Sequence, residues 1–148
     1  MLSKTAEYAL RATVWLAREP GQSESAERLA KVIQVPRRYL HKVLQDLGKA
    51  GLVRSQPGPG GGYTLSGDPC TVTILDVINA VEPFERIHGC PLGLRTHTSL
   101  CPLHLALDRA YAAMEEAFGK VTLADVLRQP STIIPLVEVV KGRRRAAR

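Results

Sequence analysis

The stretch that decides the fold is residues 25–65, SAERLAKVIQVPRRYLHKVLQDLGKAGLVRSQPGPGGGYTL. Ser25 suits the N-cap of a short helix, and a tight connection leads to Pro36, which suits the first position of a second helix. Gly51 ends that helix, and two short strands follow around a turn rich in glycine and proline, residues 57–62. The pattern predicts a helix-turn-helix followed by a hairpin, or wing, at its end.

The second helix of this stretch carries two stripes of different character. Leu40, Val43, Leu44 and Leu47 recur at helical spacing on one face, which we expect to be buried. The other face carries groups that can reach base edges and phosphates in a major groove of double-stranded DNA. The predicted DNA contacts are Arg37, Arg38, Tyr39, His41 and Lys42, with the wing residues Gly60, Gly61 and Gly62 approaching the backbone. The alternative is an amphipathic surface helix with solvated charges.

Positive charge is concentrated on this stretch and at the end of the chain. The net charge is +6 over 148 residues. Residues 25–65 hold seven Lys or Arg and two acidic residues, a net charge of +5. Residues 141–148 hold five Lys or Arg and no acid, whereas residues 66–140 hold five basic and nine acidic residues. This distribution is typical of a nucleic-acid-binding protein, although a basic end can also be a solvated terminus.

The remaining sequence predicts a mainly α fold with a long helix after the winged domain. We expect a winged helix-turn-helix domain over 1–82, a cysteine-containing sensor loop over 83–99, a dimerisation helix and a short helix over 100–128, and a basic tail over 129–148. The long helix carries apolar residues at alternating four-three spacing: Leu103, Leu107, Ala110, Met114 and Ala117. This stripe predicts either the seam of a homodimer or packing against the domain's own core.

Composition excludes several classes of protein. No apolar run approaches the roughly 20 residues of a membrane span, and residues 1–4 do not resemble a signal peptide. We therefore expect a cytoplasmic protein without membrane contact, in which the three cysteines do not form structural disulfides. No nucleophile triad, phosphate-binding loop or carboxylate pair is evident, so we do not expect an enzyme.

The segments KAGLV (49–53), GPGGGYTL (58–65) and LDVI (75–78), together with Tyr39, Leu40, Leu44 and Leu47, resemble the Rrf2 family of bacterial winged-helix transcriptional regulators. The resemblance covers about residues 1–128. It implies a homodimeric DNA-binding regulator, a repressor, whose long helix forms the dimer. Many members carry an arginine before the wing glycines, where this chain has Pro57, so we expect the wing to contact only the DNA backbone.

The resemblance also implies a metal centre in the loop before the long helix. Cys90 and Cys101 match the outer two of three cysteines in cluster-binding members, and Arg95 stands near the place of the middle one. His104 matches a histidine ligand, and Glu7 matches an acidic ligand contributed by the partner subunit. The implied cofactor is a two-iron two-sulfur cluster that responds to redox state, nitric oxide or iron.

The chemistry of these residues leaves alternatives open. Pro102 as a first helical residue places Cys101 at the N-cap, where the helix dipole favours an anion, and His104 lies one turn on. Two thiolates and an imidazole can hold a two-iron cluster if His88, His97 or Glu7 supplies a fourth ligand, and zinc accepts the same donors. Without a metal, a Cys90–Cys101 disulfide or a small molecule would switch a cluster-free regulator. A small iron–sulfur or zinc protein that does not act on DNA is a further alternative. Cys70 is expected to play no part.

Overall fold

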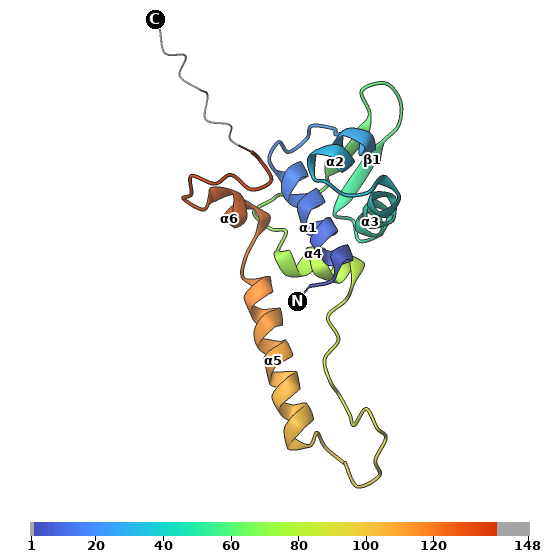
Figure 1. Ribbon diagram of the computed structural model, residues 1–148, viewed down its shortest axis with the longest axis vertical. Coiled ribbons are helices and arrows are strands. Elements are labelled where there is room, and N and C mark those ends of the chain that lie inside the picture. The colour runs from blue at the N-terminus through green and yellow to red at the C-terminus, as the bar shows by residue number, and fades with distance from the viewer. Residues whose placement is uncertain (1, 139–148) are drawn as a thin grey trace, which may run out of the picture.

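A computed structural model describes residues 2–138 as six helices and one two-stranded sheet. The elements in chain order are α1 (Lys4–Ala17), α2 (Ala26–Val32), α3 (Arg37–Lys49), β1 (Val53–Gln56), β2 (Gly62–Leu65), α4 (Ile74–Val81), α5 (Pro102–Gly119) and α6 (Leu123–Arg128). The first four helices and the β1–β2 hairpin form a head from which α5 projects, with residues 83–101 running beside it (Figure 1). This is the mainly α winged-helix fold that the sequence predicts.

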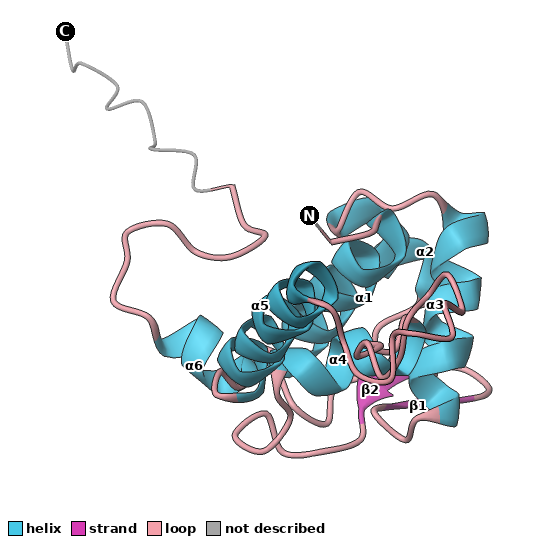
Figure 2. Ribbon diagram, turned by 90° about the horizontal axis from the view of Figure 1, so that it is seen from below, coloured by secondary structure: helices cyan, strands magenta, loops and turns pink. Residues whose placement is uncertain are grey.

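The core of the head lies where α1, α2 and α3 meet. Leu29 of α2 and Leu40, Leu44 and Leu47 of α3 are almost fully buried there. The facing side of α1 is lined by small residues such as Ala9 and Ala12, which let the helices approach closely. The two short strands lie at one edge of a body otherwise made of helices (Figure 2). Packing of this kind holds α3 firmly by one face and leaves the other face free.

The start of α3 differs by one residue from the sequence prediction. Pro36 is the N-cap of α3 rather than its first residue, with φ −57° and ψ 131°. Its carbonyl accepts the first helical hydrogen bond, from Leu40 N at 3.1 Å, as an N-cap carbonyl does. Thr73 is the N-cap of α4, where it forms a capping box with Asp76. The interaction that defines each end is a local hydrogen bond, which hydrophobic spacing does not specify.

The C-terminal end of α5 is fixed to the head. Ile74 N donates to Val121 O at 2.9 Å, and Leu123 N donates to Val72 O at 2.9 Å, so the α5–α6 connection pairs with the start of α4. Leu123 of α6 is fully buried. The N-terminal end of α5 therefore lies at the far tip of the projection (Figure 1).

The chain after α6 returns to the head, where Leu136 packs against the core. The charged end of the predicted tail, residues 141–148, lies outside the described residues. Within the described part of the chain, no helix has the length and apolar character needed to cross a membrane.

Candidate functional site

The polar face of α3 is turned to solvent. The residues predicted to contact DNA are all exposed: Arg37, Arg38, Tyr39, His41 and Lys42. The apolar stripe is at most 2% exposed: Leu40, Val43, Leu44 and Leu47. The predicted division of the helix into a buried and an exposed face is thus confirmed. Contact of the exposed face with DNA stays a prediction.

An open groove of about 660 Å³ runs between α3 and the hairpin. His41, Lys42 and Gln45 line it from the helix, and Ser55 and Tyr63 line it from the strands. Ser55 and Tyr63 are direct partners in the antiparallel register, which places both beside α3. The sequence pattern does not predict these two residues as part of the site, because a four-residue strand is too short for alternation to fix which side faces the helix.

Asp46 lies between two lysines on α3. Its carboxylate is 3.1 Å from Lys42 Nζ and 3.9 Å from Lys49 Nζ. The Lys42 side chain is 72% exposed and that of Asp46 is 16% exposed, and an i,i+4 pair on a helix is worth only about 0.3–0.5 kcal/mol. Lys42 can therefore exchange Asp46 for a phosphate at little cost.

The wing glycines have a structural role in the hairpin. A Cβ atom on Gly61 would lie 2.8 Å from Gly58 O and closer still to Gln56 O. A Cβ on Gly62 would meet the backbone carbonyl of Glu24. Gly60 has open space around it but adopts a φ of +72°, which favours glycine. These residues are therefore needed for a tight hairpin tip, whether or not they approach DNA.

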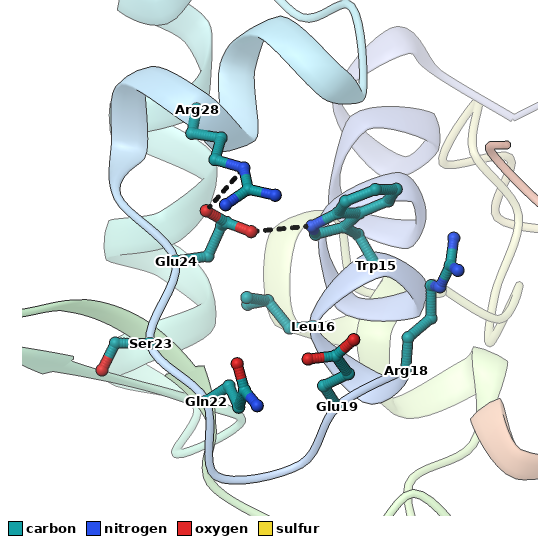
Figure 3. Close-up of a pocket in the computed structure, with 8 residues that line it drawn as sticks. All are labelled: Trp15, Leu16, Arg18, Glu19, Gln22, Ser23, Glu24 and Arg28. Carbon is teal, nitrogen blue, oxygen red and sulfur yellow. Dashed lines mark hydrogen bonds and ion pairs between the residues drawn. The ribbon is translucent and has the colours of Figure 1, made fainter.

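The hairpin is anchored to the head through Glu24. Glu24 N donates to Tyr63 O at 2.9 Å and Tyr63 N donates to Glu24 O at 2.8 Å, so this residue extends the sheet beyond β2. Its carboxylate accepts from the Trp15 indole at 3.3 Å and pairs with Arg28 at 3.4 Å. Figure 3 shows the Trp15 and Arg28 side chains converging on Glu24 from α1 and α2. The position of the hairpin is thereby tied to both helices.

The predicted metal ligands are brought together only in part. Cys101 is the N-cap of α5, and its Sγ lies 3.3 Å from His104 Nδ1. Both residues are half-buried, and the thiol makes no capping hydrogen bond. Cys90 is half-buried in the loop, and Glu7 pairs with Arg11 on α1 at 3.0 Å. Among residues 2–138, no three His, Cys, Asp or Glu side chains are placed to hold a metal ion.

The other residues considered for the centre are placed as follows. His97 is half-buried, and its Nδ1 is buried without a hydrogen-bond partner in the described chain. The imidazole nitrogen of His97 and the Cys101–His104 thiol–imidazole pair are of donor types that a metal ion accepts, although they do not converge here. His88 and Arg95 are exposed. Cys70 lies elsewhere and accepts a hydrogen bond from Arg128 at 3.2 Å.

Arg86 fastens the start of the sensor loop to α5. Its guanidinium binds Asp108 with two hydrogen bonds, of 2.7 and 2.6 Å, and reaches Glu115 at 3.4 Å. Ile87 N also donates to Asp108, at 3.0 Å. The hydrogen bonds from Arg86 lower the pKa of the Asp108 carboxyl from its usual 3.8 to about 2. Asp108 follows His104 by one turn, so the Cys101–His104 pair and this ion pair share one face of α5.

The predicted seam of α5 is open to solvent. Leu103, Leu107 and Met114 are 63%, 43% and 40% exposed, and Ala110 and Ala117 are exposed as well. None of the residues of α5 is buried. Packing of the seam against the chain's own core, one of the two alternatives from the sequence, is therefore wrong.

The architecture is that of a winged-helix protein with an appended long helix. Residues 2–129 match the Rrf2 family, described as iron-dependent transcriptional regulators, and the chain belongs to this family. It is 29% identical to the HTH-type transcriptional regulator NsrR of Bacillus subtilis over 142 residues, 93% of this chain and 97% of that protein. These relatives are transcriptional regulators and not enzymes.

Solved structures agree with this assignment. IscR of T. potens superposes with a TM-score of 0.71 at 26% identity, covering 86% of this chain and 85% of that one. CymR, the global cysteine regulator of B. subtilis, superposes with a TM-score of 0.72 at 25% identity, covering 85% of this chain and 95% of that one. The chain is thus a transcriptional regulator of the winged-helix class.

Proposed function

We propose that the protein is a homodimeric, cytoplasmic repressor that binds double-stranded DNA through α3 and the wing. The observation that carries this proposal is the exposed cationic face of α3 beside the open groove that α3 forms with the hairpin. Arg37, Arg38, Tyr39, His41 and Lys42 are the proposed major-groove contacts, and Gly60–Gly62 approach the backbone.

Selection from a randomised duplex library tests DNA binding. The protein should enrich a two-fold symmetric sequence, because a symmetric dimer presents two identical reading helices. Affinity for that duplex should fall steeply with salt concentration, since phosphate contacts release counterions. Recovery of no enriched sequence, with salt-independent binding, would contradict the proposal. A reporter gene placed downstream of the selected sequence tests repression. Its expression should rise when the regulator is deleted.

The dimer is proposed to form through the exposed face of α5. An apolar stripe on a projecting helix favours association with a second copy, because burial of its leucines and methionine releases ordered water. Leu107→Glu should convert the dimer to a monomer in analytical ultracentrifugation. Arg109→Glu introduces the same side chain off the stripe and should leave the dimer intact. A dimer that survives Leu107→Glu would place the interface elsewhere.

Cys90, Cys101 and His104 are the proposed ligands of a metal centre, completed by Glu7 of the partner subunit. The adjacent thiol and imidazole support the first part of this set. The arrangement of the elements supports the second, because α1 belongs to the head whereas the N-terminal end of α5, which Cys101 caps, lies at the far tip of the projection (Figure 1). A two-iron two-sulfur cluster would supply a redox- or nitric-oxide-sensitive group at this position, and zinc is the alternative metal.

Iron, zinc and sulfide analysis of anaerobically prepared protein tests the centre. Cys90→Ser and Cys101→Ser should each remove the metal, whereas Cys70→Ser should retain it as the matched control. Stoichiometric zinc without sulfide would make the site a zinc site. Equal metal content in all three variants would contradict the ligand assignment.

A thiol switch is the second candidate for the signal. It is favoured by the lack of three converging donors in residues 2–138. Mild oxidation should then produce a Cys90–Cys101 disulfide, detectable as the loss of two hydrogens in intact mass, and DNA affinity should change with it. Protein that binds neither metal nor sulfide yet shows this change would establish the switch.

A further inference from the structure

Four side chains from α1 and α3 form a row beside the exposed face of α3, with two tyrosine rings between two arginines. The Arg38 guanidinium carbon lies 4.8 Å above the centre of the Tyr39 ring, and Arg38 Nη2 donates to the Tyr39 hydroxyl at 3.3 Å. The Tyr39 ring in turn meets the Tyr8 ring, with centroids 6.3 Å apart and planes inclined by 49°. Arg11 covers the other end, 5.8 Å from the Tyr8 centroid. We call this set the arginine–tyrosine stack.

The far end of the stack is fixed to the head. Arg11 pairs with Glu7 at 3.0 Å and donates to the carbonyl of Ile33 at 3.3 Å. Tyr8 is half-buried and packs against the core. Tyr39, by contrast, is 49% exposed, and α3 supplies no apolar neighbour on its own exposed face. Tyr8 is thus the contact through which the core can restrain the Tyr39 ring.

This restraint matters for Arg38 because arginine is a rotamer-rich side chain. Immobilising such a side chain on binding costs about 0.5–1.5 kcal/mol. Stacking on Tyr39 fixes the plane of the guanidinium before DNA arrives and uses one of its five N–H donors. The remaining donors stay available for the two-point contact that arginine makes with guanine. A loosely held Tyr39 ring would lose this preorganisation.

We propose that Tyr8, which lies on α1 and outside the DNA-contacting helix, is a positioning residue that holds Arg38 through Tyr39 for base recognition. The inference rests on the proposed DNA-binding function and adds to it a specificity determinant in the first helix. Tyr8 acts through its ring, and the site whose binding it strengthens is a guanine-containing sequence in double-stranded DNA.

The test is a double-mutant cycle measured on the full-length protein. The probes are the duplex that the wild-type protein selects from a randomised library and a scrambled duplex of the same length. Tyr8→Leu should weaken binding to the selected duplex by roughly two- to tenfold, the worth of an aromatic pair, and leave the scrambled duplex unaffected. Tyr8→Phe keeps the ring and should bind as wild type. In an Arg38→Ala background, Tyr8→Leu should have no further effect.

Controls separate positioning from simple destabilisation. Leu10→Ala removes another half-buried side chain of α1 that packs on the core, and it should lower the melting temperature without changing the ratio of affinities for the two duplexes. In DNA-free protein, the Arg38 Nε–H proton should lose its ring-current shift in Tyr8→Leu and keep it in Tyr8→Phe.

Two results would overturn the inference while DNA binding stands. One is an equal loss of affinity for both duplexes in Tyr8→Leu, and the other is a Tyr8→Leu effect that adds fully to that of Arg38→Ala. Selection of no duplex by the wild-type protein would instead overturn the proposed function.

Discussion

Arg38 and Leu44 belong to the same helix and meet different surroundings. Arg38 is exposed on the face that borders the groove, whereas Leu44 is 2% exposed in the core. Substitutions at these positions should therefore separate binding from stability.

Arg38→Ala should leave the melting temperature nearly unchanged and cost about 1–3 kcal/mol of binding to the selected duplex, if Arg38 contacts a base. Leu44→Ala should destabilise the fold by about 2–5 kcal/mol, because it opens a cavity. Thermal melts paired with binding titrations check both. An arginine variant that melts early but binds DNA normally would refute the assignment.

The Arg86–Asp108 pair should give the protein a distinctive response to acid. The pKa of Asp108 is lowered in the folded state to about 2, so its contribution to stability is present above its usual pKa of 3.8 and is lost as the pH falls toward 2. Denaturant unfolding of wild type and Asp108→Asn should give a stability difference that is constant above about pH 4 and shrinks below it. His88 and Glu115, which also lie near this pair, are unchanged in the variant. A difference that grows on acidification would contradict the role of this pair.

At this scale the sequence predicts exposure well and long-range pairing poorly. Helical spacing was enough to divide α3 into its two faces, because burial there follows the period of the helix. Arg86 and Asp108 were not predicted to pair, since the first lies in an irregular segment whose path no periodic pattern describes. The same limit applies to Tyr8 and Tyr39, which lie on different helices.

Among the elements, the wing has the tightest local geometry. Gly61→Ala should force the hairpin tip to rearrange, because the added methyl group would overlap the carbonyls of Gln56 and Gly58. We expect a loss of about 1–3 kcal/mol in stability by denaturant unfolding, as for other overpacked sites. Gly89→Ala is the matched control, since a Cβ there meets no atom within 4 Å. Equal stability of the two variants would mean that the tip has room to adjust.

The bounds of the longer elements followed from the sequence, and their mutual arrangement did not. The long helix expected to begin at Pro102 is α5, Pro102–Gly119, because proline at a helix start and glycine at a helix end are strong signals. The pairing of the α5–α6 connection with the start of α4 was not predicted, since it depends on backbone hydrogen bonds between distant segments.

For the whole molecule, the distribution of charge predicts that the basic end of the chain contributes to DNA binding separately from α3. The five Lys or Arg of residues 141–148 should add affinity without sequence preference. Deleting residues 141–148 should weaken binding to the selected and scrambled duplexes by similar factors. Each lost phosphate contact should reduce the magnitude of the log–log salt slope by about 0.9. A changed sequence preference with an unchanged slope would assign the tail a reading role.

The arrangement of the candidate sensor site is only partly determined by the sequence pattern and by the structure of one chain. Cys101 and His104 adjoin because both lie in the first turn of one helix, which spacing predicts. Cys90 and Glu7 are placed by the path of the loop and by the proposed second chain. Their relation to the pair therefore depends on assembly, which no pattern within one sequence describes.

The Trp15–Glu24 contact has a practical consequence. The chain contains a single tryptophan, so its tryptophan emission comes from one indole, whose N–H donates a hydrogen bond to Glu24, the residue that joins the wing to the head. The intensity and the wavelength of this emission should thus report docking of the wing on the head, without an attached dye. Glu24→Gln should shift the emission spectrum, and titration with duplex should do so only if the wing moves as it engages. The protein therefore contains an intrinsic fluorescent probe of the position of the hairpin.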